Sequence, residues 1–254
     1  MKKEKNKRCD LIRKKILNLS QRVSALHIGG SFSSVEIIER VFFRILKKKD
    51  IFILSKGHAG ILLYVVLHLK GKISQSQLNL YCKKKGKLGV HPDLGTFGIN
   101  ASTGSLGHGL GLAAGIAIAE KNTSKKIFVL MSDGELQEGS VWETILFISS
   151  QGLKNIIIII DNNNLQSSTK ASDTHPTLYP IEEKFRAFGW KVSSCDGHNL
   201  NEIEKKLEKN SKKPAALIAK TIKGFPISFM KNNPKWHYRS PSKEEYNLAI
   251  KELD

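Results

Sequence analysis

The sequence predicts an α/β fold, a doubly wound and mostly parallel sheet with helices on both faces. Residues 126–131 and 155–160 are short, almost wholly apolar runs, which are typical of fully buried strands. A helical pattern over 139–151 separates them, and further strands and helices alternate after them. Such alternation is typical of a parallel sheet covered on both sides. Sheets of this kind bind ligands beyond the carboxyl ends of their strands.

The elements are expected in a simple order along the chain. Apolar residues at helical spacing predict a helix over 11–26, and a capping-box pattern of Ser33 and Glu36 predicts a second helix that begins near Ser33. The other expected elements are strands over 51–54, 126–131, 155–160, 190–193 and 215–221, and helices over 58–69, 139–151, 181–188 and 200–207. No repeat or linker divides the chain, so residues 1–254 are expected to form one domain with a loop-rich tail.

The composition narrows the class of protein. The 254 residues are 40% hydrophobic and 25% charged, which supports a sizeable core and excludes a disordered chain, a coiled coil and a collagen-like rod. The net charge of +18 fits a Lys-rich solvated surface, and it also fits phosphorylated ligands, an acidic partner or nucleic acid. The sequence lacks the zinc-finger, RNP and helix-turn-helix patterns of nucleic-acid-binding proteins. We therefore expect no nucleic-acid partner.

The cysteines and the N-terminus bear on location. Cys9, Cys82 and Cys195 lie far apart and form no CxxC pair, which argues against a disulfide framework and a Cys-based zinc site. The basic N-terminus is not followed by a long apolar run, so it is not a secretory signal. No stretch reaches the ~18 apolar residues of a membrane span. These features predict a cytoplasmic protein with no membrane partner.

Polar residues follow both central strands. Asp133 lies just after the first strand, and the run 161–164 (Asp-Asn-Asn-Asn) follows the second. Oxygen ligands at two neighbouring strand ends suit Mg²⁺, which often shares its coordination shell with substrate phosphates. Alternatively, Asp133 caps the following helix and the Asn run makes a turn. These residues alone leave both interpretations open.

The spacing of these residues resembles a known motif. Asp133-Gly134, separated by residues 135–161 from Asn162-Asn163, resembles the GDG…NN motif of thiamine-diphosphate enzymes. The wider chain resembles transketolases, above all the N-terminal subunit of split transketolases. The resemblance rests on six segments in family order: 25–30 (ALHIGG), 54–60 (LSKGHAG), 89–93 (GVHPD), 103–109 (TGSLGHG), the motif with its extension 133–143, and 228–237 (SFMKNNPKWH).

Three positions depart from the family pattern. Ser132 stands where the motif usually has Gly, and Ser is still small enough to turn beside a diphosphate. Lys223-Gly-Phe-Pro226 replaces a glycine-richer turn, and Tyr238 follows His237 where a small residue is common.

The resemblance implies a cofactor and its ligands. Thiamine diphosphate and Mg²⁺ are the implied cofactors, with the metal held by Asp133, Asn163 and the backbone carbonyl of Leu165. The implied cofactor-binding residues are His58, Gly104, Ser105, Leu106, Gly134, Glu135 and Asn163. Gly104 would bring bare backbone to the cofactor, although close helix packing also explains a Gly-rich run.

The resemblance also implies catalytic residues. His27, His58, His91 and His237 would surround the reacting carbon as hydrogen-bond donors and proton carriers. They lack the short spacing of zinc ligands. The acidic residue Glu138, and less strongly Glu143, would couple two cofactor sites across a subunit interface. Favourable charge at a helix N-terminus is the alternative role for both.

The implied activity is the transfer of a two-carbon ketol unit from a ketose or ketose phosphate to an aldose. The pyrimidine-binding half of the enzyme is absent from this sequence, so a C-terminal transketolase subunit is expected to supply it, most plausibly in a heterotetramer. The expected substrates are sugars or sugar phosphates. The alternatives are a 1-deoxyxylulose-phosphate synthase-like enzyme, which the 228–237 tail disfavours, a non-catalytic scaffold and a basic nucleic-acid-binding protein.

Overall fold

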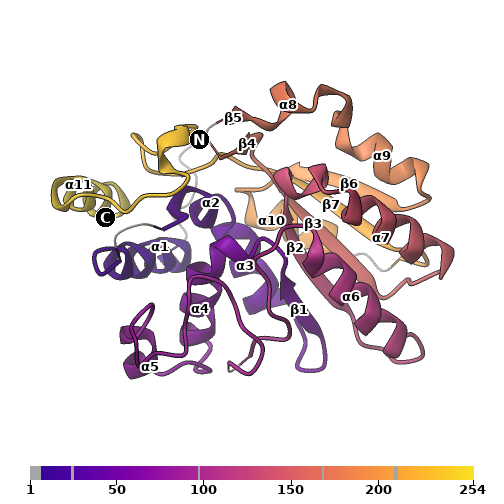
Figure 1. The fold of residues 1–254 in the computed structure, drawn as a ribbon, viewed down its shortest axis with the longest axis horizontal. Helices are drawn as coiled ribbons and strands as arrows, with labels where there is room; N and C mark the ends of the chain where they lie inside the picture. The colour runs from indigo at the N-terminus through magenta and orange to yellow at the C-terminus, as the bar shows by residue number, and fades with distance from the viewer. Residues whose placement is uncertain (1–6, 24–25, 97, 168, 209–210) are drawn as a thin grey trace.

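A five-stranded, wholly parallel sheet organises the computed structural model, which describes residues 7–23, 26–96, 98–167, 169–208 and 211–254 (Figure 1). The strand order is β1-β2-β3-β7-β6. The strands of this sheet are β1 (Ile51–Leu54), β2 (Ile127–Ser132), β3 (Ile156–Asn162), β6 (Lys191–Asp196) and β7 (Ala215–Lys220). A separate antiparallel pair is formed by β4 (Leu165–Gln166) and β5 (Thr169–Lys170).

Helices cover both faces of the sheet, as predicted. The helices are α1 (Lys7–Ser20), α2 (Ile28–Ser33), α3 (Val35–Arg40), α4 (Gly60–Leu69), α5 (Gln75–Asn79), α6 (His108–Ala119), α7 (Gly139–Ser150), α8 (Ala171–Thr174), α9 (Ile181–Ala187), α10 (Leu200–Leu207) and α11 (Lys243–Leu253). Figure 1 shows α6, α7 and α9 on one side of the sheet and α1, α3 and α4 on the other. Within the described segments, no helix combines the length and apolar character needed to cross a bilayer.

The alternation of side chains along β2 explains the two layers. Phe128 and Leu130 point into the core that holds α1, α3 and α4. Ile127, Val129 and Met131 point into the core that holds α6, α7 and α9. Because both faces are buried, the strand has no polar face, and its sequence is a continuous apolar run.

Several predicted elements differ from the structure. The predicted helix 11–26 ends at Ser20, and residues 24–25 of its expected end, which include Ala25 of the first family-like segment, lie outside the described residues. The predicted strand 190–193 runs on to Asp196. The tail is not all loop, because α11 follows a capping box formed by Ser242 and Glu245. Helix α6 was not predicted, since Gly, Ala, Leu and Ile give it almost no polar face.

The predicted capping box of Ser33 and Glu36 is wrong. Helix α2 already begins at Ile28, so Ser33 is its last residue. The Ser33 hydroxyl donates to Asp161, 2.6 Å away, and the Glu36 carboxylate faces Arg13. Buried charged partners therefore take the two side chains that would have capped the helix.

Glu36 joins three separate parts of the fold. Its carboxylate accepts from Arg13 Nη2 at 2.7–2.8 Å and from His198 Nδ1 at 3.0 Å. His198 Nε2 in turn accepts from the backbone N–H of Ile222 at 2.9 Å. Burial opposes the charged form of Glu36, but Arg13 and His198 outweigh it and hold the pKa of this carboxyl below its usual 4.5. The stabilisation is therefore present above pH 4.5 and is lost as pH falls through the lower pKa of the folded state.

We expect Glu36→Gln to lower the free energy of unfolding by about 3–5 kcal/mol at pH 7, because it leaves the Arg13 guanidinium buried without a counter-charge. The loss should shrink as the pH falls below 4.5, where the wild-type carboxylate also takes up a proton. Urea unfolding between pH 3 and pH 7 measures both effects. Glu183→Gln, at an exposed position of α9, is the matched control and should change stability by less than about 0.5 kcal/mol. A loss that does not vary with pH would contradict the charge-based explanation.

Candidate functional site

The site lies at the carboxyl edge of the sheet, where β2 and β3 end together. Ser132 pairs with Asp161 in the ladder, so Asp133 and the 162–165 turn leave the sheet side by side. The backbone N–H of Asn164 donates to Asp133 Oδ2, and Asn164 has a left-handed φ of 58° that turns the chain back toward this carboxylate. Asp133 thus lies beside the turn that carries Asn163 and Leu165, and the role of these three residues as metal ligands stays a prediction.

The Asp133 carboxyl is fully buried and poorly neutralised. Burial, and then the nearby Asp161, raise its pKa to about 7, although hydrogen bonds from Asn164 and Gly134 act in the opposite direction. Asp133 also caps the short helix that follows it, which was the alternative role given by the sequence, because its carboxylate accepts from the Gly134 N–H at 2.9 Å. The second carboxylate oxygen faces the 163–165 turn. A buried carboxylate of this kind is suited to a cation.

The donor set on this turn fits Mg²⁺. It combines the Asp133 carboxylate, the Asn163 amide oxygen and the Leu165 carbonyl, all of them hard oxygen atoms. The Leu165 carbonyl accepts a long 3.4 Å contact from Lys223 Nζ. The described part of the chain contains no group of three or more His, Cys, Asp or Glu side chains that could hold a metal. The residues present therefore suit a hard cation that shares its shell with a ligand.

Three of the four predicted histidines meet above this edge. The ring centroid of His27 lies 5.1 Å from that of His58 and 5.0 Å from that of His237. Burial, with neighbouring cationic side chains, lowers the pKa of His27 and of His237 to about 4 and the pKa of His58 well below its usual range. All three are neutral at pH 7, so each ring has one donor and one acceptor nitrogen.

His91 lies beside the trio on another loop. Its ring packs against Gly104, where a Cβ would come within 3.0 Å of the His91 ring. Gly104 has a left-handed φ of 158°, so glycine is needed there both for the backbone conformation and for the space. At Gly57, likewise, a Cβ would lie 2.7 Å from the backbone of residues 103 and 104. The glycines thus bring the 103–107 loop against the histidine-bearing turn.

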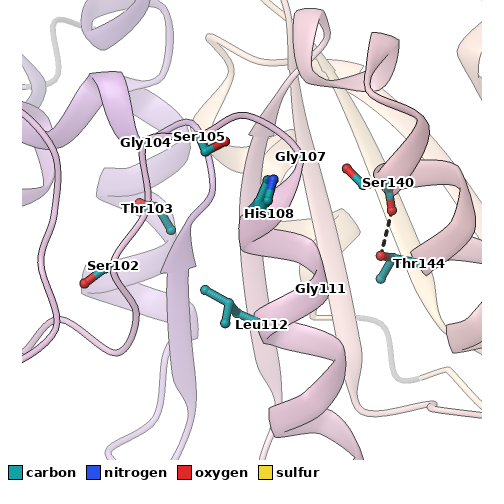
Figure 2. Close-up of a pocket in the computed structure, with 10 residues that line it drawn as sticks. All are labelled: Ser102, Thr103, Gly104, Ser105, Gly107, His108, Gly111, Leu112, Ser140 and Thr144. Carbon is teal, nitrogen blue, oxygen red and sulfur yellow. Dashed lines mark hydrogen bonds between the residues drawn. The ribbon is translucent and has the colours of Figure 1, made fainter.

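The same loop borders a pocket of about 570 Å³ between α6 and α7 (Figure 2). Gly104 and Ser105 line it, together with His108, Leu112 and Ser140. Figure 2 shows the loop above the start of α6, with Ser140 and Thr144 of α7 opposite. Leu106 is half-buried and is not part of the lining.

The acidic residues after Asp133 differ in their surroundings. Glu135 is completely buried and accepts from Ser55 Oγ at 2.6 Å, from the Ser132 N–H at 2.9 Å and from the Gly107 N–H at 3.2 Å. Its side chain therefore ties the 103–107 loop to the sheet, and its predicted contact with a cofactor stays a prediction. Gly134 packs against Gln166, Glu138 is the exposed N-cap residue of α7, and Glu143 is also exposed.

Two buried lysines belong to the site, and we did not predict either of them. Lys56 forms an ion pair with Asp161 and also donates to the Gly30 carbonyl at 2.8 Å. Lys223 Nζ lies 3.0 Å from His237 Nδ1 and forms no ion pair within the described ranges. Burial, and then the charge of Lys56, lower the pKa of Lys223 to about 8. The sequence offered a signal only for Lys56, which lies inside the family-like segment 54–60, whereas Lys223 lies in a turn that departs from the family pattern. Buried lysines are rare in general.

These features define a class of protein: an α/β domain whose sheet edge brings together a buried carboxyl beside a turn, a cluster of neutral histidines and buried positive charge. The chain matches the family model described as "Transketolase, thiamine diphosphate binding domain" over residues 5–252. It therefore belongs to the transketolase family, and both the predicted family and the predicted fold class are confirmed.

Relatives agree with this assignment. The chain is 39% identical to a subunit of the apulose-4-phosphate transketolase of Actinobacillus succinogenes, covering 98% of this chain and 96% of that one. It is 34% identical to 6-deoxy-6-sulfo-D-fructose transketolase subunit SqwG of a Clostridium species, covering 96% and 94% of the two chains. The solved transketolase of Campylobacter jejuni superposes with a TM-score of 0.91 at 28% identity, and this chain covers 42% of its length.

Proposed function

We propose that this chain is the N-terminal, diphosphate-binding subunit of a thiamine-diphosphate- and Mg²⁺-dependent transketolase that moves a two-carbon ketol unit between sugars. One observation carries the proposal. Asp133 and the 162–165 turn lie at the same sheet edge as the cluster of His27, His58 and His237. The names of the relatives support a ketose or ketose phosphate as the donor.

The polar residues of the site divide into two groups by charge. Asp133, the Asn163 amide oxygen and the Leu165 carbonyl would hold Mg²⁺, and the metal would bridge to a diphosphate. Lys223 would supply the positive charge that such an anion needs, because its ammonium is buried without a carboxylate within ion-pair distance in the described chain, whereas the charge of Lys56 is already paired with Asp161. Thiamine diphosphate, when bound, supplies the carbanion chemistry of ketol transfer.

The metal assignment is tested by Asp133→Ala. Because this carboxylate is the only charged ligand of the proposed set, the variant should lose Mg²⁺-dependent stabilisation by thiamine diphosphate, while Asn163→Ala, which removes a neutral ligand, should weaken it less. Thermal unfolding with cofactor and a Mg²⁺ titration measures the effect. Asp173→Ala, at an exposed position of α8, is the control and should behave as wild type. Unchanged Mg²⁺ dependence in the Asp133 and Asn163 variants would exclude this site.

The histidines can hold and move protons at the substrate oxygens. Lys223 Nζ donates to His237 Nδ1, which places the proton of that neutral ring on Nε2. Donors that face the oxygen where negative charge develops stabilise the transition state more than the ground state. His58 packs against Gly30, where a Cβ would lie in ordinary van der Waals contact with its ring.

We expect His58→Ala to lower kcat/KM by ~10²–10⁴-fold, the usual contribution of a positioned proton-transfer group. Cofactor affinity should change little, because the proposed metal ligands and the buried Lys223 are other residues. Steady-state kinetics of the complex of both subunits, with cofactor binding measured in parallel, separates the two effects. His175→Ala, at an exposed histidine outside the cluster, should keep wild-type kinetics. Equal kcat/KM in both variants would make His58 a structural residue.

The outer face of α6 and α7 supports a protein partner. Leu112 and Ile118 of α6 are 47% and 42% exposed, and Leu146 and Phe147 of α7 are 54% and 43% exposed. Large apolar side chains that gather on one face mark an interaction surface. The face is continuous with the pocket beside Gly104, so a subunit docked there would also close the site. We assign this surface to a C-terminal, pyrimidine-binding subunit, with two chains of each kind in a cytoplasmic heterotetramer and Glu138 near the subunit boundary.

Leu146→Asp should weaken binding of the partner subunit by at least tenfold and reduce ketol transfer in proportion, because it places a charge in an apolar contact. Leu248→Asp is the matched control, since Leu248 is 55% exposed but lies on α11. Sedimentation of the mixed subunits gives the assembly constant. Both variants should unfold at the wild-type temperature as isolated chains. Ketol transfer by this chain alone, or equal assembly of the two variants, would contradict the partner assignment.

A further inference from the structure

Asp161 is the most heavily hydrogen-bonded side chain of the site, although no ligand can reach it. It is completely buried at the end of β3. One oxygen, Oδ1, accepts from the hydroxyl of Thr221. The other, Oδ2, accepts from Ser33 Oγ at 2.6 Å, Ser34 Oγ at 2.9 Å and Asn163 Nδ2 at 3.3 Å, and from the Lys56 ammonium. The carboxylate thus connects the end of α2, the turn after β1, its own strand end and the residue after β7.

The contact with Asn163 is the one that reaches the proposed metal site. An amide side chain presents either its oxygen or its NH₂ group to a neighbour, and only the oxygen binds a cation. On one side of Asn163 is the Asp161 carboxylate, which can only accept. On the other side is the backbone N–H of Leu165, which can only donate and lies 3.0 Å from Asn163 Oδ1. The two neighbours therefore allow a single orientation of the amide, with its oxygen toward the turn that ends at Leu165.

We propose that Asp161 is a positioning residue for Asn163: by accepting the amide Nδ2–H, it turns the amide oxygen toward the metal. This inference rests on the proposed function, because it presupposes a cation bound by Asp133, Asn163 and Leu165. A carbonyl oxygen has two lone pairs, so Oδ1 can accept from the Leu165 N–H and still coordinate a metal. Groups that orient a metal ligand contribute substantially to metal affinity although they never touch the ion.

The same carboxylate keeps Lys56 in place. The three N–H groups of the Lys56 ammonium are taken up by Asp161, the Gly30 carbonyl at 2.8 Å and Ser34 Oγ at 2.9 Å. Lys56 is completely buried, so without Asp161 its charge would have no counter-charge in direct contact. Removal of Asp161 should therefore have two effects, a general loss of stability through Lys56 and a specific loss of metal affinity through Asn163.

A double-mutant cycle separates these two effects. A carboxylate presents an oxygen whichever way it turns, so Asn163→Asp needs no orienting neighbour. We expect Asp161→Ala to weaken Mg²⁺ binding by ~10–100-fold when residue 163 is Asn, and by a few-fold at most in the Asn163→Asp background. Because Asn163→Asp also places a carboxylate beside Asp161 and near Lys56, the cycle is repeated in the Lys56→Met background, where no unpaired ammonium can lower the Mg²⁺ affinity. The apparent Mg²⁺ affinity is measured by calorimetry on the full chain at saturating thiamine diphosphate.

Thr221→Val is the matched control. It removes a donor from the other oxygen of the same carboxylate and leaves the Asn163 contact in place. It should lower the unfolding temperature and leave the Mg²⁺ affinity unchanged. If Asp161→Ala alone does not fold, the cycle in the Lys56→Met background decides, because no buried ammonium is left unpaired there.

The outcomes are distinct. A large effect of Asp161 that disappears in the Asn163→Asp background supports the positioning role. Equal effects in both backgrounds, or a loss of Mg²⁺ affinity in Thr221→Val that matches its loss of stability, overturn it and make Asp161 purely structural. If the affinity of the wild-type chain for thiamine diphosphate is the same with and without Mg²⁺, the metal site itself is refuted, and the positioning role with it.

Discussion

The buried ion pair between Lys56 and Asp161 is the interaction on which the arrangement of the site depends. It joins the turn after β1 to the end of β3, across the strand β2 that lies between them in the sheet. Burying two charges is unfavourable unless the remaining donors and lone pairs are satisfied, and here serines, a threonine and a backbone carbonyl satisfy them. The histidine-bearing turn and the 162–165 turn, which is proposed to hold the metal, are therefore held in a fixed relation by the protein itself.

The parts of the fold set by local pattern could be predicted from the sequence. The strand 51–54 and the helix 200–207 have the predicted bounds, and the strands β2, β3 and β7 begin or end within about two residues of their predicted ends. The errors occur where tertiary contacts override a local signal. Ser33 matches a helix cap, but it donates to a carboxylate 128 residues away in the chain. Helix α6 has no polar stripe because a large part of its outward face is itself apolar.

Individual site residues could be predicted only within the segments that resemble the family. Three acidic residues, Asp133, Glu135 and Asp161, lie close to the strand ends, and the family resemblance implied a role for Asp133 and Glu135 but none for Asp161. Burial and partners distinguish them. Asp133 faces the 163–165 turn, Glu135 holds the 103–107 loop by a hydrogen bond, and Asp161 forms an ion pair with Lys56. The roles of Lys56 and Lys223 were missed for the same reason, since their importance comes from burial, which depends on the whole fold.

The lowered pKa of Lys223 has a consequence for the turnover of the protein in the cell. A buried ammonium that forms no ion pair within the described residues is unfavourable, and an anionic ligand bound beside it offsets that cost. Ligand that binds only the folded state stabilises it by about 2.7 kcal/mol at a hundredfold excess over its Kd. Chains without ligand unfold more often and are degraded faster. The steady-state amount of this protein should therefore follow the cellular supply of its anionic ligand.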